Sequence, residues 1–222
     1  MGVVQLDRFV AVAARKSNNF FDTLLGQRMS ASSSDTYVSR GGDKLAAALS
    51  YFQINVTGLL CADLGSHVGG FVDCLLQHGA RKVYSVDTSY GTLAWTLRKD
   101  ERVVVLERTN AMHVSLPETV DLVTIDAGWT KQSKILPNAL KLIGAASTGV
   151  VLTLIKPHYE AEKSLLIDGV LPDQNRNETV GRALEEIEST GWRVGETFES
   201  PIAGHGGNHE VFAMLSPCRN DA

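Results

Sequence analysis

A glycine-rich turn between an apolar strand and a helix is the stretch of the sequence best suited to bind a ligand. The apolar run Leu59–Ala62 leads into Asp63 and Gly65, and apolar residues at helical spacing follow Gly69. This pattern predicts a buried strand, a turn and a helix. Glycines let the backbone approach a ligand closely, and the helix N-terminus offers unpaired N–H groups. The turn indicates a binding site, although a plain turn of an α/β protein has the same pattern.

A second acidic residue narrows the choice of ligand. Asp87 ends another apolar strand about 20 residues beyond the turn, where an acidic residue typically binds the hydroxyls of a ribose. The spacing Gly65-x3-Gly69-Gly70 differs from the G-x-G-x-x-G pattern of dinucleotide sites. We therefore expect a nucleoside ligand without a pyrophosphate, and S-adenosylmethionine (SAM) is the leading candidate.

Two other predicted strands are followed by charged residues. Asp126 follows the run Leu122–Ile125, and Lys156 follows the run Val150–Ile155. In open parallel sheets, ligands bind beyond the carboxyl ends of the strands. A half-buried lysine is costly unless it has a partner, although a lysine can also reach the surface with its stem on the core. Asp126 on the neighbouring strand end favours a paired functional site.

Strands and helices alternate along most of the chain, as in a parallel sheet with helices on both faces. After the first strand, we expect strands at 82–87, 102–106, 120–126 and 149–155, and helices at 45–52, 69–78, 91–98 and 131–144. A helix at 177–189, with Thr179 and Glu186 on its polar side, precedes closing strands at 192–198 and 211–215. The predicted fold class is α/β. We expect a mostly parallel seven-stranded sheet with an antiparallel C-terminal edge hairpin, which is how the Rossmann-like SAM-dependent methyltransferase fold ends.

The N-terminal residues differ in composition from the rest of the chain. Residues 1–30 mix charged residues with helix formers and predict one or two short helices, and Ser30–Thr36 is a serine-rich linker. We expect residues 1–38 to form a short extension and residues 39–222 to form the main domain.

Composition sets limits on function. The formal net charge of −4 does not indicate the basic surface of most nucleic-acid-binding domains, although a local basic face is compatible with it. No apolar run approaches the ~20 residues that cross a membrane. The three cysteines form no C-x-x-C pair, and they suggest a reducing, cytoplasmic setting and no metal site. We expect loop or surface positions, without metal-ligand companions, for His67, His113, His158, His205 and His209.

Five segments occur in an order that is similar to that of a known family. They are Ser39–Leu45, Asp63–Phe71, Glu107–Asn110, Ile155–Ala161 and Gly206–Glu210. Together they resemble the haemolysin A (TlyA) branch of the FtsJ-like ribose methyltransferases. The resemblance implies that residues 39–222 form a methyltransferase domain, which moves a methyl group from SAM to a ribose 2′-hydroxyl of ribosomal RNA.

The resemblance also implies which residues act. By motif, the catalytic set is Lys44, Asp126, Lys156 and Glu210. A 2′-hydroxyl is a poor nucleophile, so a base must take its proton, and a protonated lysine cannot do so. A second cation and the exclusion of water both lower the pKa of a lysine. We therefore expect Lys156 to be the base, with Lys44 beside it. Asp126 would orient Lys156, and Glu210 would hold Lys44 or the ribose.

The expected SAM-binding residues lie in the glycine-rich turn and at the strand ends: Asp63, Gly65, Ser66, Gly69, Gly70, Phe71, Asp87, Thr109, Asn110 and Asp126. Two stretches depart from the family pattern. His67 and Val68 replace two hydroxyl side chains of the turn, which bears on contacts to the methionine end of SAM. Ala127-Gly-Trp129 replaces a Ser-Phe-Ile-like run, and Trp129 would either stack on a base or adenine, or lie in the core.

RNA-binding residues are expected on loops around the site. Arg40, Lys131 and Lys134, with Lys44, Arg108 and Lys163, predict a basic rim on an acidic chain. Residues 1–38 are too few for the N-terminal S4 RNA-binding domain of the family. The expected partner is therefore ribosomal RNA or a ribosomal particle, and we expect a folded ribosomal particle or a partner protein to present the target. Two alternatives fit the same residues: a catalytically silent SAM- or RNA-binding protein, and a methyltransferase for small molecules, which the acidic charge favours.

Overall fold

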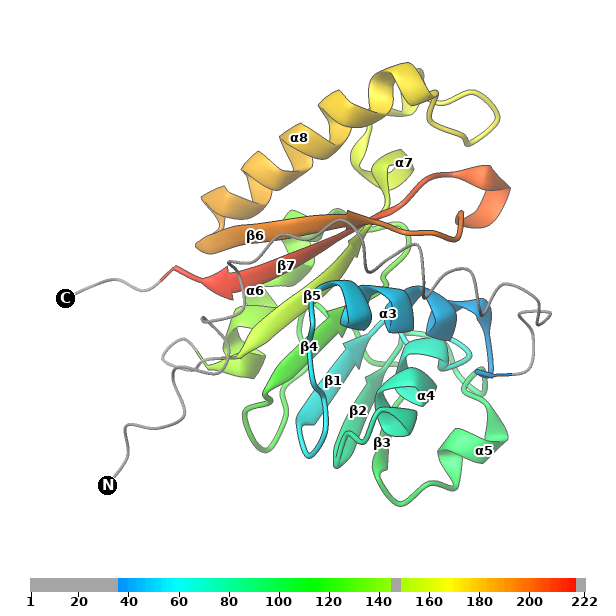
Figure 1. Ribbon diagram of the computed structural model, residues 1–222, viewed down its shortest axis with the longest axis vertical. Helices are drawn as coiled ribbons and strands as arrows, with labels where there is room; N and C mark the ends of the chain where they lie inside the picture. The colour runs from blue at the N-terminus through cyan, green and yellow to red at the C-terminus, as the bar shows by residue number, and fades with distance from the viewer. Residues whose placement is uncertain (1–35, 145–148, 219–222) are drawn as a thin grey trace, which may run out of the picture.

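A seven-stranded sheet lies at the centre of the computed structural model, which describes residues 36–144 and 149–218 (Figure 1). The strands are β1 (Leu60–Leu64), β2 (Lys82–Val86), β3 (Val103–Leu106), β4 (Leu122–Ile125), β5 (Val150–Ile155), β6 (Trp192–Glu199) and β7 (Val211–Pro217). The helices are α3 (Arg40–Tyr51), α4 (Gly70–Gln77), α5 (Trp95–Arg98), α6 (Gln132–Ile143), α7 (Pro157–Glu160) and α8 (Asp173–Ser189), with 3₁₀ turns at Lys163–Leu165 and His205–Gly207. The helices expected within residues 1–30 and most of the serine-rich linker lie outside the described residues.

The order of the strands confirms the predicted fold class. The sheet runs β3-β2-β1-β4-β5-β7-β6. Strands β1 to β5 pair in parallel, whereas β7 is antiparallel to both β5 and β6. The chain adds strands on one side of β1 and then returns to add β4 and β5 on the other. This reversal places a binding crevice at the carboxyl ends of β1 and β4.

Two hydrophobic cores enclose the sheet, because helices pack on both of its faces (Figure 1). Alternate residues of β1 point to opposite faces: Leu60 and Ala62 join the core under α6 and α8, and Cys61 joins the core under α3 and α4. Strands buried on both faces are continuous apolar runs, which is why the sequence identifies them. The cores fix the strand ends at which the charged residues lie.

The helix expected at 91–98 is shorter in the structure, where α5 begins only at Trp95. The backbone N–H of Ala94 bonds to the carbonyl of Val68 at 3.0 Å, which ties this segment to the glycine-rich turn. The side chain of Leu97 also packs against Gly69. These tertiary contacts hold the residues directly before Trp95 in a non-helical conformation.

The last helix, α8, starts earlier than predicted, and one residue expected on its polar side is buried. It begins at Asp173, and Thr179 is buried rather than on the polar side, whereas Glu186 is exposed as expected. The Thr179 hydroxyl donates to the carbonyl of Asn175 at 2.8 Å, so it can be buried without losing a hydrogen bond. Within residues 36–144 and 149–218, no helix is long and apolar enough to cross a membrane.

Substitutions of one buried and one exposed tryptophan test the packing of the hydrophobic core. Trp192 is 1% exposed, whereas Trp95 is 67% exposed. We expect Trp192→Ala to lower the free energy of unfolding by about 3–5 kcal/mol, because it leaves a cavity in the core. Trp95→Ala should lower it by less than ~1 kcal/mol. Chemical denaturation of both variants measures the difference, and equal losses would contradict this packing.

Candidate active site

The turn between β1 and α4 needs glycine for its backbone conformation and for space. Gly65 has a φ of 95°, and a Cβ there would lie 2.8 Å from the carbonyl oxygen of Asp126. Gly69 has a φ of 102°, and a Cβ there would collide with the side chain of Leu97. The turn therefore lies directly against the end of β4, as a ligand site between β1 and β4 requires.

Asp87 supports this turn from the end of β2. Its Oδ2 accepts the N–H of His67 at 2.7 Å, and its Oδ1 accepts the N–H and hydroxyl of Ser89 at 2.7 and 2.6 Å. Burial acts to raise the pKa of Asp87, but the hydrogen bonds from Ser89 and His67 outweigh it and lower the pKa. Asp87 is thus a carboxylate at neutral pH, with lone pairs left for a ligand.

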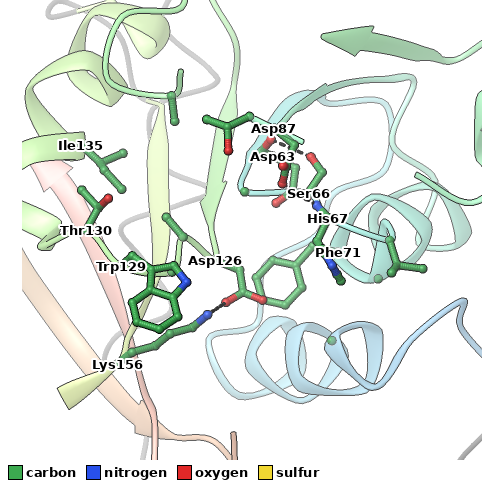
Figure 2. A pocket seen from close by; sticks show the side chains of 18 of the residues that line it. Asp63, Ser66, His67, Phe71, Asp87, Asp126, Trp129, Thr130, Ile135 and Lys156 are labelled. Atoms are coloured by element: carbon green, nitrogen blue, oxygen red, sulfur yellow. Dashed lines mark hydrogen bonds and ion pairs between the residues drawn. The ribbon is translucent and has the colours of Figure 1, made fainter. Parts of the chain in front are cut away.

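A cavity of about 570 Å³ opens at these strand ends, a size that suits a small-molecule ligand. The predicted residues that line it are Arg40, Lys44, Asp63, Gly65, Ser66, Gly70, Phe71, Asp87, Thr109, Asn110, Asp126 and Lys156. Figure 2 shows Asp63, Ser66 and Asp87 close together, with Asp126 and Lys156 joined by an ion pair farther along the cavity. The predicted residues of the described part of the chain that do not line it are Gly69, Arg108, Lys131, Lys134, Lys163 and Glu210.

Two lysine–carboxylate ion pairs connect the predicted catalytic residues. The Nζ atom of Lys156 lies 2.6 Å from Oδ1 of Asp126, and the Nζ atom of Lys44 lies 2.6 Å from Oε2 of Glu210. Lys44 and Glu210 are the more deeply buried pair, at 8% and 2% exposure. The structure thus brings these four residues to one site, and Glu210 reaches the cavity through its bond to Lys44.

The expectation that Lys156 has a lowered pKa is wrong for the ligand-free protein. Burial acts to lower the pKa of Lys156, but attraction to Asp126 and a hydrogen bond with it, together with Glu210 and Tyr159, outweigh burial and raise the pKa. Lys44 is not a free cation beside Lys156, because Glu210 pairs with it. Lys156 is therefore an ammonium group at neutral pH while Asp126 holds it.

Asp63 is fully buried in the wall of the cavity. Its Oδ1 accepts the hydroxyl of Thr124 at 2.7 Å, whereas its Oδ2 has no hydrogen-bond partner among the described residues. Burial raises the pKa of Asp63 to about 7, and the negative charges of Asp126 and Asp87 act in the same direction. The hydrogen bond from Thr124 acts against the rise. An unpaired buried oxygen suits a ligand that brings a hydrogen-bond donor.

Trp129 lines the cavity and is 88% exposed, so the alternative of a core tryptophan is wrong. Its φ of 63° is a costly conformation for a residue other than glycine. The Trp129 and Tyr159 ring centroids are 5.1 Å apart, and those of Tyr159 and His158 are 4.1 Å apart. His158 is buried, contrary to its expected surface position, and burial with the nearby Lys156 and Lys44 lowers its pKa to about 4.

The three predicted RNA-binding residues do not form one group. Arg40 is exposed and lines the cavity. Lys131 lies 3.7 Å from Glu186 and lines a separate cavity of about 70 Å³, whose walls include residues of α7 and α8. Lys134 is exposed on α6. The rim is therefore partly neutralised on the side of Lys131, which the sequence did not indicate.

Sequence reasoning missed a connection between the two loops that carry Asp126 and Lys156. Glu160 is buried, and its Oε1 accepts the N–H of Gln132 at 2.9 Å at the start of α6. The side chain of Gln132 in turn accepts the hydroxyl of Thr153 at 2.5 Å. The one feature of the sequence that could have indicated a role for Glu160 is its position shortly after Lys156 in the chain. No cluster of three metal-binding side chains occurs in the described part of the chain.

Comparisons with known proteins define the class of this site. The sequence pattern of the FtsJ-like methyltransferases matches residues 37–216, so the chain belongs to the FtsJ-like methyltransferase family. Over 186 residues it is 41% identical to the 16S/23S rRNA (cytidine-2′-O)-methyltransferase TlyA of Mycobacterium tuberculosis, covering 81% of this chain and 68% of that protein. It is 37% identical to Hemolysin A of Brachyspira hyodysenteriae, covering 80% and 75% of the two chains. Its relatives within the family are thus the TlyA/haemolysin A proteins.

Solved structures agree with this assignment. A candidate hemolysin from Lactococcus lactis superposes with a TM-score of 0.77 at 36% identity, covering 81% of this chain and 88% of that one. Fibrillarin from Aeropyrum pernix, solved with bound SAM, superposes with a TM-score of 0.57 at 19% identity, covering 78% and 74%. The second match supports the fold, which is that of SAM-dependent methyltransferases.

The raised pKa of Asp63 predicts a pH dependence of stability. A folded-state pKa of about 7, against an ordinary value of 3.8, means that the folded protein binds this proton more tightly than the unfolded chain does. The resulting stabilisation is complete below the ordinary pKa and is lost as the pH rises through about 7. Asp63→Asn removes this titration.

The melting temperature of the wild-type protein should therefore fall more between about pH 5 and pH 8 than that of the Asp63→Asn variant. Thermal melts of both proteins in the absence of SAM measure the difference. Two melting curves that shift in parallel across this range would contradict the assignment.

Proposed function

We propose that this protein transfers a methyl group from SAM to a ribose 2′-hydroxyl of ribosomal RNA. The observation that carries the proposal is the presence of two ion pairs, Lys156–Asp126 and Lys44–Glu210, beside a cavity at the strand ends of a methyltransferase fold. Buried lysines are costly, and a module that only binds SAM has no need of two. The substrate class follows from the relative in Mycobacterium tuberculosis, which is named as an rRNA ribose methyltransferase.

The residues of the cavity suit SAM. Asp87 offers a carboxylate to ribose hydroxyls, and the unpaired oxygen of Asp63 can accept a hydrogen bond from an amino group. Bound SAM supplies an electrophilic methyl group on a positively charged sulfur. Asp126 places a negative charge next to Lys156, which favours a cation in this part of the cavity. The other proposed contacts are Gly65, Ser66, Gly70, Phe71, Thr109 and Asn110.

We assign Lys156 as the general base and Asp126 as the residue that orients it. In the ligand-free protein Lys156 keeps its proton, because Asp126 stabilises the ammonium form. A positive charge in the cavity competes for Asp126, and RNA over the site excludes water. Both changes lower the pKa of Lys156, so that its Nζ can accept the proton of the 2′-hydroxyl. Lys44, held by Glu210, fixes the opposite side of the acceptor ribose.

The acceptor nucleotide enters beside Trp129. An exposed indole at the cavity, with Tyr159 next to it, offers a flat surface on which a base can stack. This contact does not need the indole to move, because the loop already presents it to solvent. The departure from the family pattern after Asp126 therefore retains an aromatic residue for the substrate.

A folded ribosomal particle presents the substrate. The net charge of −4 and the pairing of Lys131 with Glu186 leave a weak hold on naked RNA, while Arg40 and Lys134 add local positive charge. We assign residues 39–222 to the methyltransferase domain and residues 1–38 to an extension of it. An enzyme that modifies ribosomal RNA acts in the cytoplasm, which is the location we propose.

Labelled SAM and ribosomal subunits test the function and the base together. Lys156→Ala should lower the rate of methyl transfer by at least about 100-fold, with the affinity for SAM nearly unchanged. Lys156→Arg should not restore it, because a guanidinium stays protonated. Lys82→Ala, which removes a half-buried lysine paired with Glu118 outside the cavity, is the matched control and should keep full activity.

Mapping of ribose methylation identifies the product. Substantial turnover by Lys156→Arg would rule out Lys156 as the base. No transfer by the wild-type protein to any ribosomal RNA or subunit would overturn the proposed function itself.

Calorimetry of SAM binding tests Asp87. Asp87→Ala should weaken SAM at least about tenfold, because charge-assisted hydrogen bonds to the ribose are each worth about 1.5–3 kcal/mol. The variant also loses the bond that holds the N–H of His67. Asp100→Ala is the matched control, because Asp100 also accepts a backbone N–H, that of Arg102, but lies outside the cavity. Equal SAM affinity of the two variants would contradict the role of Asp87.

A further inference from the structure

The segment between β2 and the end of α5 exposes two aromatic rings that the core does not use. Tyr90 is 69% exposed and Trp95 is 67% exposed. A large aromatic side chain normally buries much of its area, so two such rings within one short segment need an explanation. Neither ring belongs to a hydrophobic core cluster of the described residues.

Each ring carries a cation on one of its faces. The guanidinium of Arg108 lies 4.3 Å from the centre of the Tyr90 ring, and the Nζ of Lys99 lies 4.9 Å from the centre of the Trp95 ring. Neither cation forms an ion pair with a carboxylate among the described residues, whereas the neighbouring Arg98 does. Exposed cation–π pairs contribute little to stability, which leaves both rings and both charges open to a partner.

The backbone under these side chains is fixed. Glu107 accepts the N–H of Gly91 at 2.8 Å and also pairs with Arg98 from the same segment. The N–H of Arg108 donates to the carbonyl of Ser89 at 3.1 Å, which joins the loop after β3 to the loop after β2. The rings are therefore presented by a braced loop, and a partner meets them without ordering the chain first.

The same segment adjoins the cavity. Thr88 and Thr109 line the cavity, and they lie within two residues of Tyr90 and Arg108. Tyr90 follows Asp87, which Figure 2 shows with Asp63 and Ser66, away from Trp129 and Lys156. An RNA strand that has its acceptor ribose at Lys156 can therefore pass over the mouth of the cavity, above the bound SAM, toward Tyr90.

We propose that Tyr90, Trp95, Lys99 and Arg108 form a docking surface, here called the aromatic–cation patch, for the single-stranded RNA next to the acceptor nucleotide. Exposed rings interleaved with unpaired cations are the combination that binds single strands, because bases stack on the rings and phosphates meet the cations. The two cations of the patch, Lys99 and Arg108, match a polyanion. The proposal rests on RNA being the substrate, as proposed above.

Substitutions of the rings test the stacking contribution. The probe is a single-stranded RNA of about 12 nucleotides, whose affinity is measured by fluorescence anisotropy. Tyr90→Leu and Trp95→Leu, which keep apolar bulk but remove the ring, should each weaken binding about tenfold. Tyr90→Phe and Trp95→Phe keep a ring and should bind within about twofold of the wild type. SAM affinity should stay unchanged in all four variants.

Substitutions of the cations test the electrostatic contribution separately. Lys99→Ala and Arg108→Ala should each lower the slope of log affinity against log salt by about 0.7, the value for one lost phosphate contact on a single strand. The ring variants should leave this slope unchanged. Arg81→Ala is the matched control, because Arg81 is an exposed cation at the amino end of β2, away from the cavity. It should change neither the slope nor the affinity.

Assays of methyl transfer to ribosomal subunits separate this proposal from the function on which it rests. If the wild type methylates subunits but the ring and cation variants bind RNA and turn over like the wild type, the patch is not an RNA site. Loss of turnover on subunits with unchanged RNA affinity would also overturn the proposal, because it would indicate a protein contact. Absence of wild-type methyl transfer to any ribosomal RNA would instead reject the proposed function.

Discussion

The ion pair between Asp126 and Lys156 is the interaction on which the rest of the site depends. These residues follow β4 and β5, which pair in parallel with Ile125 beside Thr153. Adjacent parallel strands end at the same edge of a sheet, so the fold delivers both charges to one point. Their side chains are 25% and 16% exposed, and removal of either partner leaves a largely buried charge unpaired. The same contact sets the resting protonation state of Lys156, because Asp126 favours the ammonium form.

The second ion pair depends on β7, the one strand of the described sheet that runs opposite to the others. β7 runs antiparallel to β5 and pairs Val211 with Ile155, so it begins where β5 ends. Glu210, directly before Val211, therefore lies at the edge that holds Lys156 and can reach Lys44 of α3. A parallel strand would have placed its first residue at the opposite edge. Gly204 completes the arrangement, because a Cβ at that position would collide with the carboxylate of Glu210.

The sequence predicts those features that depend on local pattern or on a required glycine. Strands β1, β4 and β5 are continuous apolar runs because both of their faces are buried, and Gly65 occupies a position that excludes a Cβ. The direction of the pKa shift of Lys156 was not predictable in this way. Asp126 is the main cause of the raised pKa, and Glu210, which lies far along the chain from both lysines, adds to it while it also pairs with Lys44. The exposure of Trp129 was also not predictable, because burial is inferred from a repeating hydrophobic pattern and a single aromatic residue in a loop belongs to none.

The unpaired charges of the site are separated by depth. Lys44 and Lys156 in the cavity wall are each paired with a carboxylate. Asp87, in contrast, is a carboxylate without an ion-pair partner among the described residues, and it favours a cationic ligand. Exposed cations such as Arg40 and Arg108 lie nearer the surface, where screening limits their reach to about 8–10 Å at physiological salt. SAM carries positive charge and RNA carries negative charge, so a surface of uniform sign would oppose one of the two. Because each group of charges acts only over its own short range, a chain with a net charge of −4 can bind both ligands at one site.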